Sequence, residues 1–194
     1  MSPRSKEQIA VIRSESTNKI LMASVELFTT NGFAGTSVNA IAKRAGVSKG
    51  LIYNYFESKD DIVKELVNMA LKMADDIMEN AAVKNSETPK QELKTLIDVF
   101  FETIEQQTEM MRWILPLAFQ VSKFSFVTEM VTAKIDSTIG VMHDIFDRLG
   151  YENPEMEAWL LGAIMDGLGV DVTIMNDYKT DEIHKFIYKK YNLI

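Results

Sequence analysis

Residues 36–56, "TSVNAIAKRAGVSKGLIYNYF", hold two short segments with helix-forming character, separated by a turn that contains glycine. Apolar positions repeat at helical spacing up to Ala45, and Gly46 is placed to end that first helix. Ser48 can cap a second helix, expected over about residues 49–55. Two short helices joined by a turn of three or four residues are the sequence form of a helix-turn-helix.

The second of these helices is predicted to have two unlike faces at 100° per residue. One face is apolar and would dock on neighbouring helices, since so short a helix is unstable alone: Leu51, Ile52 and Phe56. The other face is polar, with Tyr55 at its boundary: Lys49, Gly50, Tyr53 and Asn54. A cation, a glycine, a phenol and an amide suit contacts to phosphates and base edges. A compact helical domain whose short helices simply have mixed faces is the alternative that these residues leave open.

Helical spacing of apolar residues recurs along the rest of the chain, and no segment alternates as a β-strand does. Further helices are expected at about residues 15–31, 59–81, 127–149, 154–175 and 181–191, and from Pro89 onward in two runs interrupted at Pro116. The polar segment 84–90 is predicted to be a linker. We therefore predict an all-α protein of about nine helices with short connections.

Composition narrows the possible functions of these 194 residues, of which 46% are hydrophobic, enough to bury a core. The absence of cysteine excludes disulfides and thiolate metal sites, and two histidines argue against a zinc site, so we expect no metal and no cofactor. No apolar signal segment and no run of about 18 apolar residues occurs, which predicts a soluble, cytoplasmic protein without a membrane partner.

Enzyme signatures are also missing from the sequence. There is no E-x-x-H of a di-metal bundle, no G-x-S-x-G, no cysteine nucleophile and no glycine loop for phosphate, so we predict that the chain is not an enzyme. The net charge of −7 hides a split, because residues 1–60 carry eight Lys/Arg against five Asp/Glu, whereas the remainder carries 13 against 23. A basic part and an acidic part are expected to meet different partners.

The stretch "TSVNAIAKRAGVSKGLIYNYFESKDDIVKEL", residues 36–66, resembles the N-terminal DNA-binding module of TetR/AcrR-type transcriptional regulators. The shared features are Thr/Ser opening the second helix, Ile-Ala, Ala-Gly-Val-Ser, Lys-Gly, Tyr-x-Tyr-Phe and a following Ser-Lys, and the resemblance extends upstream to about residue 17. It implies a three-helix, helix-turn-helix DNA-binding domain with an N-terminal arm at residues 1–60. Residues 61–194 would then form an effector-binding and dimerisation domain.

Carried over residue by residue, the resemblance implies phosphate contacts from Ser37 and Ser48 at two helix starts. It places four residues in or beside the major groove: Lys49, Gly50, Tyr53 and Asn54. Tyr55 and Lys59 would hold the flanking backbone, and Asn39 would reach a base edge. Asn54 stands where the family often has His, and Asn can pair with adenine, so the preferred operator is expected to differ. The arm, with Arg4, Lys6 and Arg13, would either enter the minor groove or remain a solvated tail.

Two of the predicted helices in residues 61–194 suit a homodimer. The helix at 127–149 is amphipathic and the one at 154–175 is apolar nearly all round, so two copies of each could form a four-helix bundle about a two-fold axis. The expected dimer interface is Val131, Ile135, Met142, Trp159, Gly162 and Gly169. A dimer would read the half-sites of a palindromic double-stranded operator about one helical turn apart.

Aromatic and methionine side chains gather around Pro116 and suit an effector pocket, although an ordinary core has the same composition. The candidates are Phe100, Phe101, Met110, Trp113, Phe119, Gln120, Phe126 and Asp166. Asp166 would orient a cationic ligand or lie satisfied in a dimer interface. The leading hypothesis is a homodimeric repressor that an apolar or amphipathic small molecule releases from its operator. The alternative is an architectural DNA-binding protein with the same head and no effector.

Overall fold

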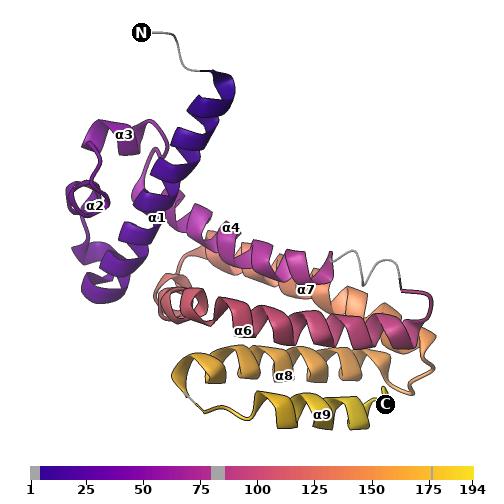
Figure 1. Cartoon of the computed structure of the whole chain (residues 1–194). Helices are drawn as coiled ribbons and strands as arrows, with labels where there is room; N and C mark the ends of the chain where they lie inside the picture. The colour runs from indigo at the N-terminus through magenta and orange to yellow at the C-terminus, as the bar shows by residue number, and fades with distance from the viewer. Residues whose placement is uncertain (1–4, 80–85, 176) are drawn as a thin grey trace. The chain divides into compact units, whose positions relative to one another are not determined.

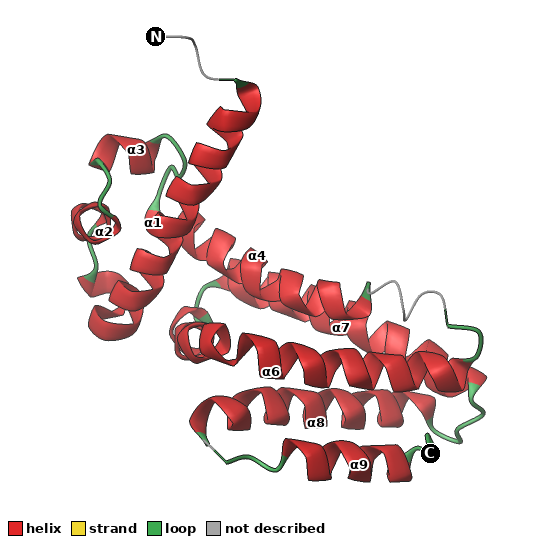
Figure 2. Ribbon diagram, viewed as in Figure 1, coloured by secondary structure: helices red, strands yellow, loops and turns green. Residues whose placement is uncertain are grey.

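The computed structural model describes residues 5–79, 86–175 and 177–194, and in this part all regular structure is helical (Figures 1 and 2). The described helices are α1 (Lys6–Gly35), α2 (Val38–Ala45), α3 (Lys49–Tyr53), α4 (Lys59–Met78), α6 (Pro89–Val121), α7 (Ser125–Arg148), α8 (Pro154–Ile174) and α9 (Thr180–Lys190). The predicted all-α class is confirmed, and the predicted count is close. The break predicted at Pro116 was wrong, because α6 continues through this residue.

The chain divides into two compact units. The head unit comprises Met1–Met69 with Pro116–Val127, and the bundle unit comprises Ala70–Leu115 with Thr128–Ile194. Three helices, α4, α6 and α7, contribute residues to both units. The functional boundary that the sequence suggests between residues 60 and 61 stays a prediction.

Helix α1 begins earlier than expected, in a region predicted to be an irregular arm. Ser5 and Gln8 form a capping box, in which the Gln8 N–H donates to Ser5 Oγ at 3.2 Å and the Ser5 N–H donates to Gln8 Oε1 at 3.1 Å. At its other end Gly32 has a φ of 74° and interrupts the helical backbone, as a glycine can. The Thr36 hydroxyl donates to the carbonyl oxygens of Gly32 and Leu27 at 2.9 and 3.0 Å, which fixes the turn into α2.

The core of the head unit gathers apolar side chains from all of its helices. Members buried to 2% exposure or less are Ile20, Leu21, Val25, Phe28, Ile41, Ile52, Ile62, Val63 and Val121. Helices α2 and α3 lie on the same side of α1 (Figure 1). Neither is long enough to be stable alone, so their buried apolar residues are what hold them in place.

The core of the bundle unit is formed by α6, α7, α8 and α9, and α6, α8 and α9 lie side by side (Figure 1). Its fully buried members are Leu93, Leu96, Ile97, Ile104, Met142, Ile145, Phe146, Ala158 and Leu161. Helices α7 and α8 approach closely at Gly162, where a Cβ atom would lie 3.2 Å from Ile139 Cδ1. A glycine there allows the contact between the two helices.

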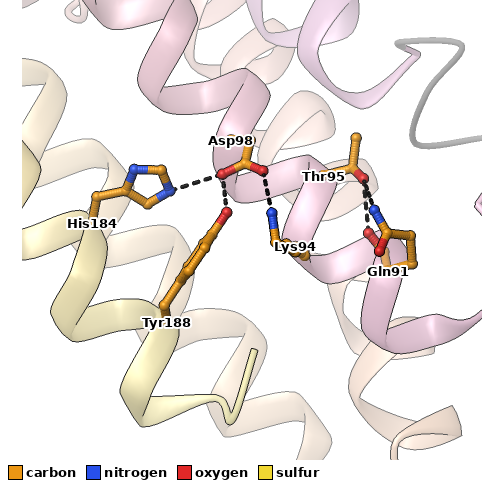
Figure 3. A network of polar contacts seen from close by, with 6 residues as sticks. All are labelled: Gln91, Lys94, Thr95, Asp98, His184 and Tyr188. Atoms are coloured by element: carbon orange, nitrogen blue, oxygen red, sulfur yellow. Dashed lines mark hydrogen bonds and ion pairs between the residues drawn. The ribbon is translucent and has the colours of Figure 1, made fainter. Parts of the chain in front are cut away.

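A polar network joins α9 to α6 beside this core (Figure 3). The Asp98 carboxylate accepts hydrogen bonds from the Tyr188 hydroxyl and, at 3.0 Å, from Lys94 Nζ, and it lies 2.9 Å from His184 Nε2. The His184 ring stacks on Phe101 with 4.2 Å between the ring centres. Burial alone would raise the pKa of Asp98, but the hydrogen bonds from Tyr188 and Lys94 hold it below its ordinary value.

Candidate nucleic-acid interface

The turn between α2 and α3 has the geometry of a Schellman motif. Gly46 adopts the left-handed conformation with φ 68° and ψ 30°, and the Val47 N–H donates to the Ala42 carbonyl oxygen at 3.0 Å. Ser48 then caps α3, and its Oγ accepts a hydrogen bond from the Leu51 N–H at 3.1 Å. The turn therefore ends one helix and begins the next within three residues, as the sequence predicted.

The two faces of the α3 region differ in exposure, as periodicity predicted. Ile52 is 1% exposed and Phe56 is 7% exposed, whereas Tyr53 is 50% exposed. The other residues of the polar face are also exposed: Lys49, Gly50 and Asn54. Tyr55 is half-buried at the boundary. Helix α3 and its cap therefore present a cation, a phenol and an amide to a partner outside the protein.

The two serines at the helix starts have hydroxyl groups that are only partly used. Ser37 Oγ accepts from the Ala40 N–H at 3.1 Å, as Ser48 Oγ does from the Leu51 N–H. Each hydroxyl accepts in its cap, so its own proton is available to donate to an anion such as a phosphate. Both serines are exposed, and so is Asn39 on the first turn of α2.

Gly50 has open space where a side chain would be. A Cβ atom at this position would meet only Ser48 Oγ, at 4.0 Å. The packing of the protein therefore does not require glycine at this position. If glycine is required here, the reason is a partner whose surface approaches the backbone closely and leaves no room for a side chain.

Lys59 points toward the backbone of its own chain. Its Nζ donates to the carbonyl oxygens of Phe33 and Thr36, both at 2.7 Å, and lies 4.4 Å from the centre of the Phe33 ring. These contacts join the start of α4 to the end of α1. The resemblance implies a contact from Lys59 to the flanking DNA backbone, and this geometry gives it an internal structural role.

Arg13 lies next to the boundary of the polar face of α3. Its guanidinium carbon is 5.3 Å from the centre of the Tyr55 ring, and Lys49 Nζ is 5.8 Å from the centre of the Tyr53 ring. Sequence reasoning placed Arg13 in an arm and missed this pairing. The S-x-x-Q capping box at Ser5 is the signal that could have predicted a helix through Arg13.

Four of the predicted effector residues have described side chains, and the effector site stays a prediction. Phe100 and Phe101 are buried in the bundle core, with 5.5 Å between their ring centres. Phe126 belongs to the head unit, where Lys64 Nζ lies 5.4 Å from the centre of its ring. Asp166 is exposed, and partial desolvation of its carboxyl raises its pKa above the ordinary value. The remaining candidates have side chains outside the described part of the structure: Met110, Trp113, Phe119 and Gln120.

A partly open pocket of about 230 Å³ lies elsewhere in the bundle unit, between α6 and the segment that joins α8 to α9. Its lining residues are Ile104, Glu105, Thr108, Arg112, Val172, Met175, Tyr178 and Thr180. Arg112 Nε donates to the Thr173 carbonyl oxygen at 3.1 Å, and the Tyr178 hydroxyl donates to Asp171 at 2.8 Å. Sequence reasoning proposed none of these residues for a pocket, because residues of α6 meet those near the end of α8 only through the packing of helices distant in sequence.

The residues predicted for the dimer interface divide between surface and core. Ile135 and Trp159 are exposed, at 40% and 44%, and Val131 and Gly169 are half-buried. Met142 lies in the bundle core, and Gly162 is half-buried beside α7. Further exposed apolar residues lie on the same two helices: Val141, Met156, Leu160 and Ile174.

No helix in residues 5–79, 86–175 and 177–194 is long and apolar enough to cross a membrane. The same described residues contain no group of three or more metal-ligating side chains.

Comparison with known proteins gives a family match inside the head unit and curated relatives that match over longer stretches. Residues 20–66 match the profile described as "Bacterial regulatory proteins, tetR family". The HTH-type transcriptional regulator EthR of Mycolicibacterium smegmatis is 29% identical over 102 residues, which are 53% of this chain and 47% of that protein. The uncharacterized HTH-type transcriptional regulator YxaF of Bacillus subtilis is 25% identical over 177 residues, 87% of this chain and 90% of that protein.

The chain spans about half the length of the curated relatives that it matches first, with coverage of 47%, 44% and 48%. Curated relatives such as EthR and YxaF are named as regulators of transcription and not as enzymes. Among solved structures, NalD of Pseudomonas aeruginosa, the secondary repressor of the MexAB-OprM multidrug efflux pump, superposes with a TM-score of 0.69. The two sequences are 22% identical, and the superposition covers 92% of this chain and 96% of the NalD chain, which shows a shared fold.

Proposed function

We propose that this chain, which belongs to the tetR family of bacterial regulatory proteins through residues 20–66, is a DNA-binding repressor of transcription that works as a homodimer. The observation that carries DNA binding is the outward face of α3, where Lys49, Tyr53 and Asn54 are exposed around the open backbone of Gly50. Such a face can enter the major groove, with the hydroxyls of Ser37 and Ser48 donating to phosphates.

Dimerisation follows from the apolar surface that α7 and α8 leave exposed. Trp159 and Leu160 are each 44% exposed and Met156 is 58% exposed, which is a high exposure for three apolar residues within two turns of one helix. A second copy of the chain would cover these side chains in a self-complementary contact about a two-fold axis. The same axis would present two copies of α3 to two half-sites of a palindromic operator.

The pocket in the bundle unit is the site that we propose for an effector. Its lining combines apolar side chains with the hydroxyls of Thr108 and Tyr178 and the charges of Glu105 and Arg112, a mixture that suits a small amphipathic molecule. Helix α6 supplies four of the lining residues and has residues in both compact units. The effector would act by binding unequally to DNA-competent and DNA-incompetent states.

Footprinting on the DNA that flanks the protein's own gene tests the proposed function. We expect protection of two half-sites about one helical turn apart. Absence of any protected site would contradict it. Weak protection spread along the fragment, unchanged by every compound that raises the melting temperature, would favour the architectural alternative.

The effector site has its own test, in which amphipathic compounds are screened for a rise in melting temperature and for release of the footprinted DNA. Thr108→Phe would fill the pocket and should abolish both responses while DNA binding persists. Glu102→Phe is the matched control, because Glu102 is exposed on the same helix and does not line the pocket. Responses that survive Thr108→Phe would place the effector elsewhere.

A further inference from the structure

We infer that Arg13 binds a DNA phosphate beside α3, with the Tyr55 ring holding its guanidinium in place, a role that rests on the proposed DNA binding. The two residues lie far apart in sequence, Arg13 in α1 and Tyr55 in the turn after α3, and the Arg13 guanidinium carbon lies 5.3 Å from the centre of the Tyr55 ring. Arg13 is exposed, whereas Tyr55 is half-buried. The ring is therefore fixed by the protein, and the cation faces solvent.

A guanidinium that lies over an aromatic ring keeps its N–H groups in the plane of the guanidinium. A guanidinium parallel to the ring would leave these donors free to form a bidentate pair with phosphate oxygens. A lysine ammonium can also sit over a ring, but it has no planar fork to match the phosphate. The pairing therefore presents the charge of Arg13 outward at the edge of the polar face of α3.

The helix that carries Arg13 gives this contact a defined position. Helix α1 begins at Lys6, after the N-cap Ser5, and its backbone remains helical up to Gly32. Between these ends, apolar residues from Ile20 to Phe28 pack in the core of the head unit. Arg13 is therefore attached to the same rigid helix that supports α2 and α3. A side chain on such a helix loses less conformational entropy on binding than one on a flexible arm.

Two other cations of the head unit are held by the protein itself. Lys59 donates to two backbone carbonyls at 2.7 Å, and Arg44 Nε donates to Glu26 Oε1 at 2.9 Å. Arg13 and Lys49 instead lie over tyrosine rings, one at the boundary of the polar face and one at the start of α3. Arg13 thus supplies the flanking phosphate contact that the sequence resemblance assigns to Lys59.

Salt dependence of DNA binding measures this contact directly. Each neutralised phosphate contributes about 0.9 to the slope of log K against log salt on duplex DNA, so Arg13→Gln should reduce the slope by about 0.9 for each bound copy. The same reduction is expected on the footprinted site and on a mixed-sequence duplex, because a phosphate contact carries no sequence information. Arg13→Lys should restore most of the slope.

The role of the Tyr55 ring and a control residue, Lys19, are tested with the full-length chain in the same assay. Tyr55→Phe keeps the ring and should keep the slope, whereas Tyr55→Leu should weaken the Arg13 contact, so that adding Arg13→Gln to it changes little. Lys19→Gln removes an exposed positive charge six positions further along α1, on a different face, and should leave the slope unchanged.

Failure of this inference differs from failure of the proposed function. Wild-type protein that binds neither duplex would overturn DNA binding itself. Wild-type binding with an unchanged slope in Arg13→Gln, or an equal reduction in Lys19→Gln, would overturn only the role of Arg13. Circular dichroism of each variant, with an unaltered helix content, ties the change in slope to the lost charge.

Discussion

The rings of Phe33 and Phe124 pack edge-to-face, with 5.0 Å between their centres and 73° between their planes. Phe33 lies at the end of α1, and Phe124 lies in the turn between α6 and α7, so this pair attaches residues 116–127 to the rest of the head unit. Helix α6, which ends just before this turn, has residues in both units.

A double-mutant cycle with Phe33→Leu and Phe124→Leu should give a coupling energy of about 0.5–1.5 kcal/mol, the usual value for an aromatic pair beyond its buried area. Unfolding in urea, followed by circular dichroism, supplies the four free energies of unfolding. Additive effects of the two substitutions, within about 0.3 kcal/mol, would mean that the rings do not stabilise each other.

Gly50→Ala should separate stability from DNA binding. The space around Gly50 accepts a Cβ atom, and alanine favours a helix over glycine by up to about 1 kcal/mol, so the melting temperature should stay the same or rise. The added methyl would keep a DNA partner from the backbone, and we expect Kd to increase at least about tenfold, or about 1.4 kcal/mol. A melting temperature that falls would instead show that the protein itself needs glycine there.

Trp159→Glu should convert the proposed dimer to a monomer in sedimentation experiments. A charge at this exposed position of α8 would be buried without a partner when two copies associate. Phe186→Glu is the matched control, since Phe186 is 69% exposed on α9 and lies outside the proposed interface. A dimer that survives the first substitution and dissociates with the second would move the interface to α9.

The stability of the bundle unit should depend on pH through Asp98. Its pKa in the folded protein lies below the unfolded value of about 3.9, so its contribution is present above that pH and is lost as pH falls through the folded pKa. Asp98→Asn should therefore lower the free energy of unfolding at pH 7, and the difference from wild type should shrink below about pH 4.

Asp136→Asn, on the exposed surface of α7, serves as the control for that measurement. Asp136→Asn should leave the free energy of unfolding unchanged at pH 7 and at pH 3. A loss in Asp98→Asn that is the same at pH 7 and at pH 3 would mean that the ionised carboxylate does not stabilise the junction of α6 and α9.

The helix-turn-helix was predictable from sequence because its determinants are local. Gly46 sets the turn, Ser48 caps α3, and the buried positions follow from helical spacing within a few residues. The break expected at Pro116 was wrong because α6 keeps its helical backbone on both sides of the proline, so one missing N–H donor does not end the helix.

Side-chain partners far apart in sequence were not predictable in the same way. The carbonyl oxygens that Lys59 contacts lie 23 and 26 residues away, and they are brought together by the interruption of α1 at Gly32. The pocket near Arg112 likewise depends on how α6 packs against the end of α8. Periodicity gives the face on which a residue lies but not the residue that it meets across the fold.

The most direct test of the account compares wild type with Tyr53→Ala on the footprinted DNA by equilibrium titration, together with sedimentation of both proteins. Tyr53 is 50% exposed on the outward face of α3, so its removal should leave folding and dimer mass unchanged. We expect a loss of at least about 1 kcal/mol in binding, a rise of Kd of roughly fivefold or more. Undiminished binding by Tyr53→Ala would contradict the claim that this face of α3 reads DNA.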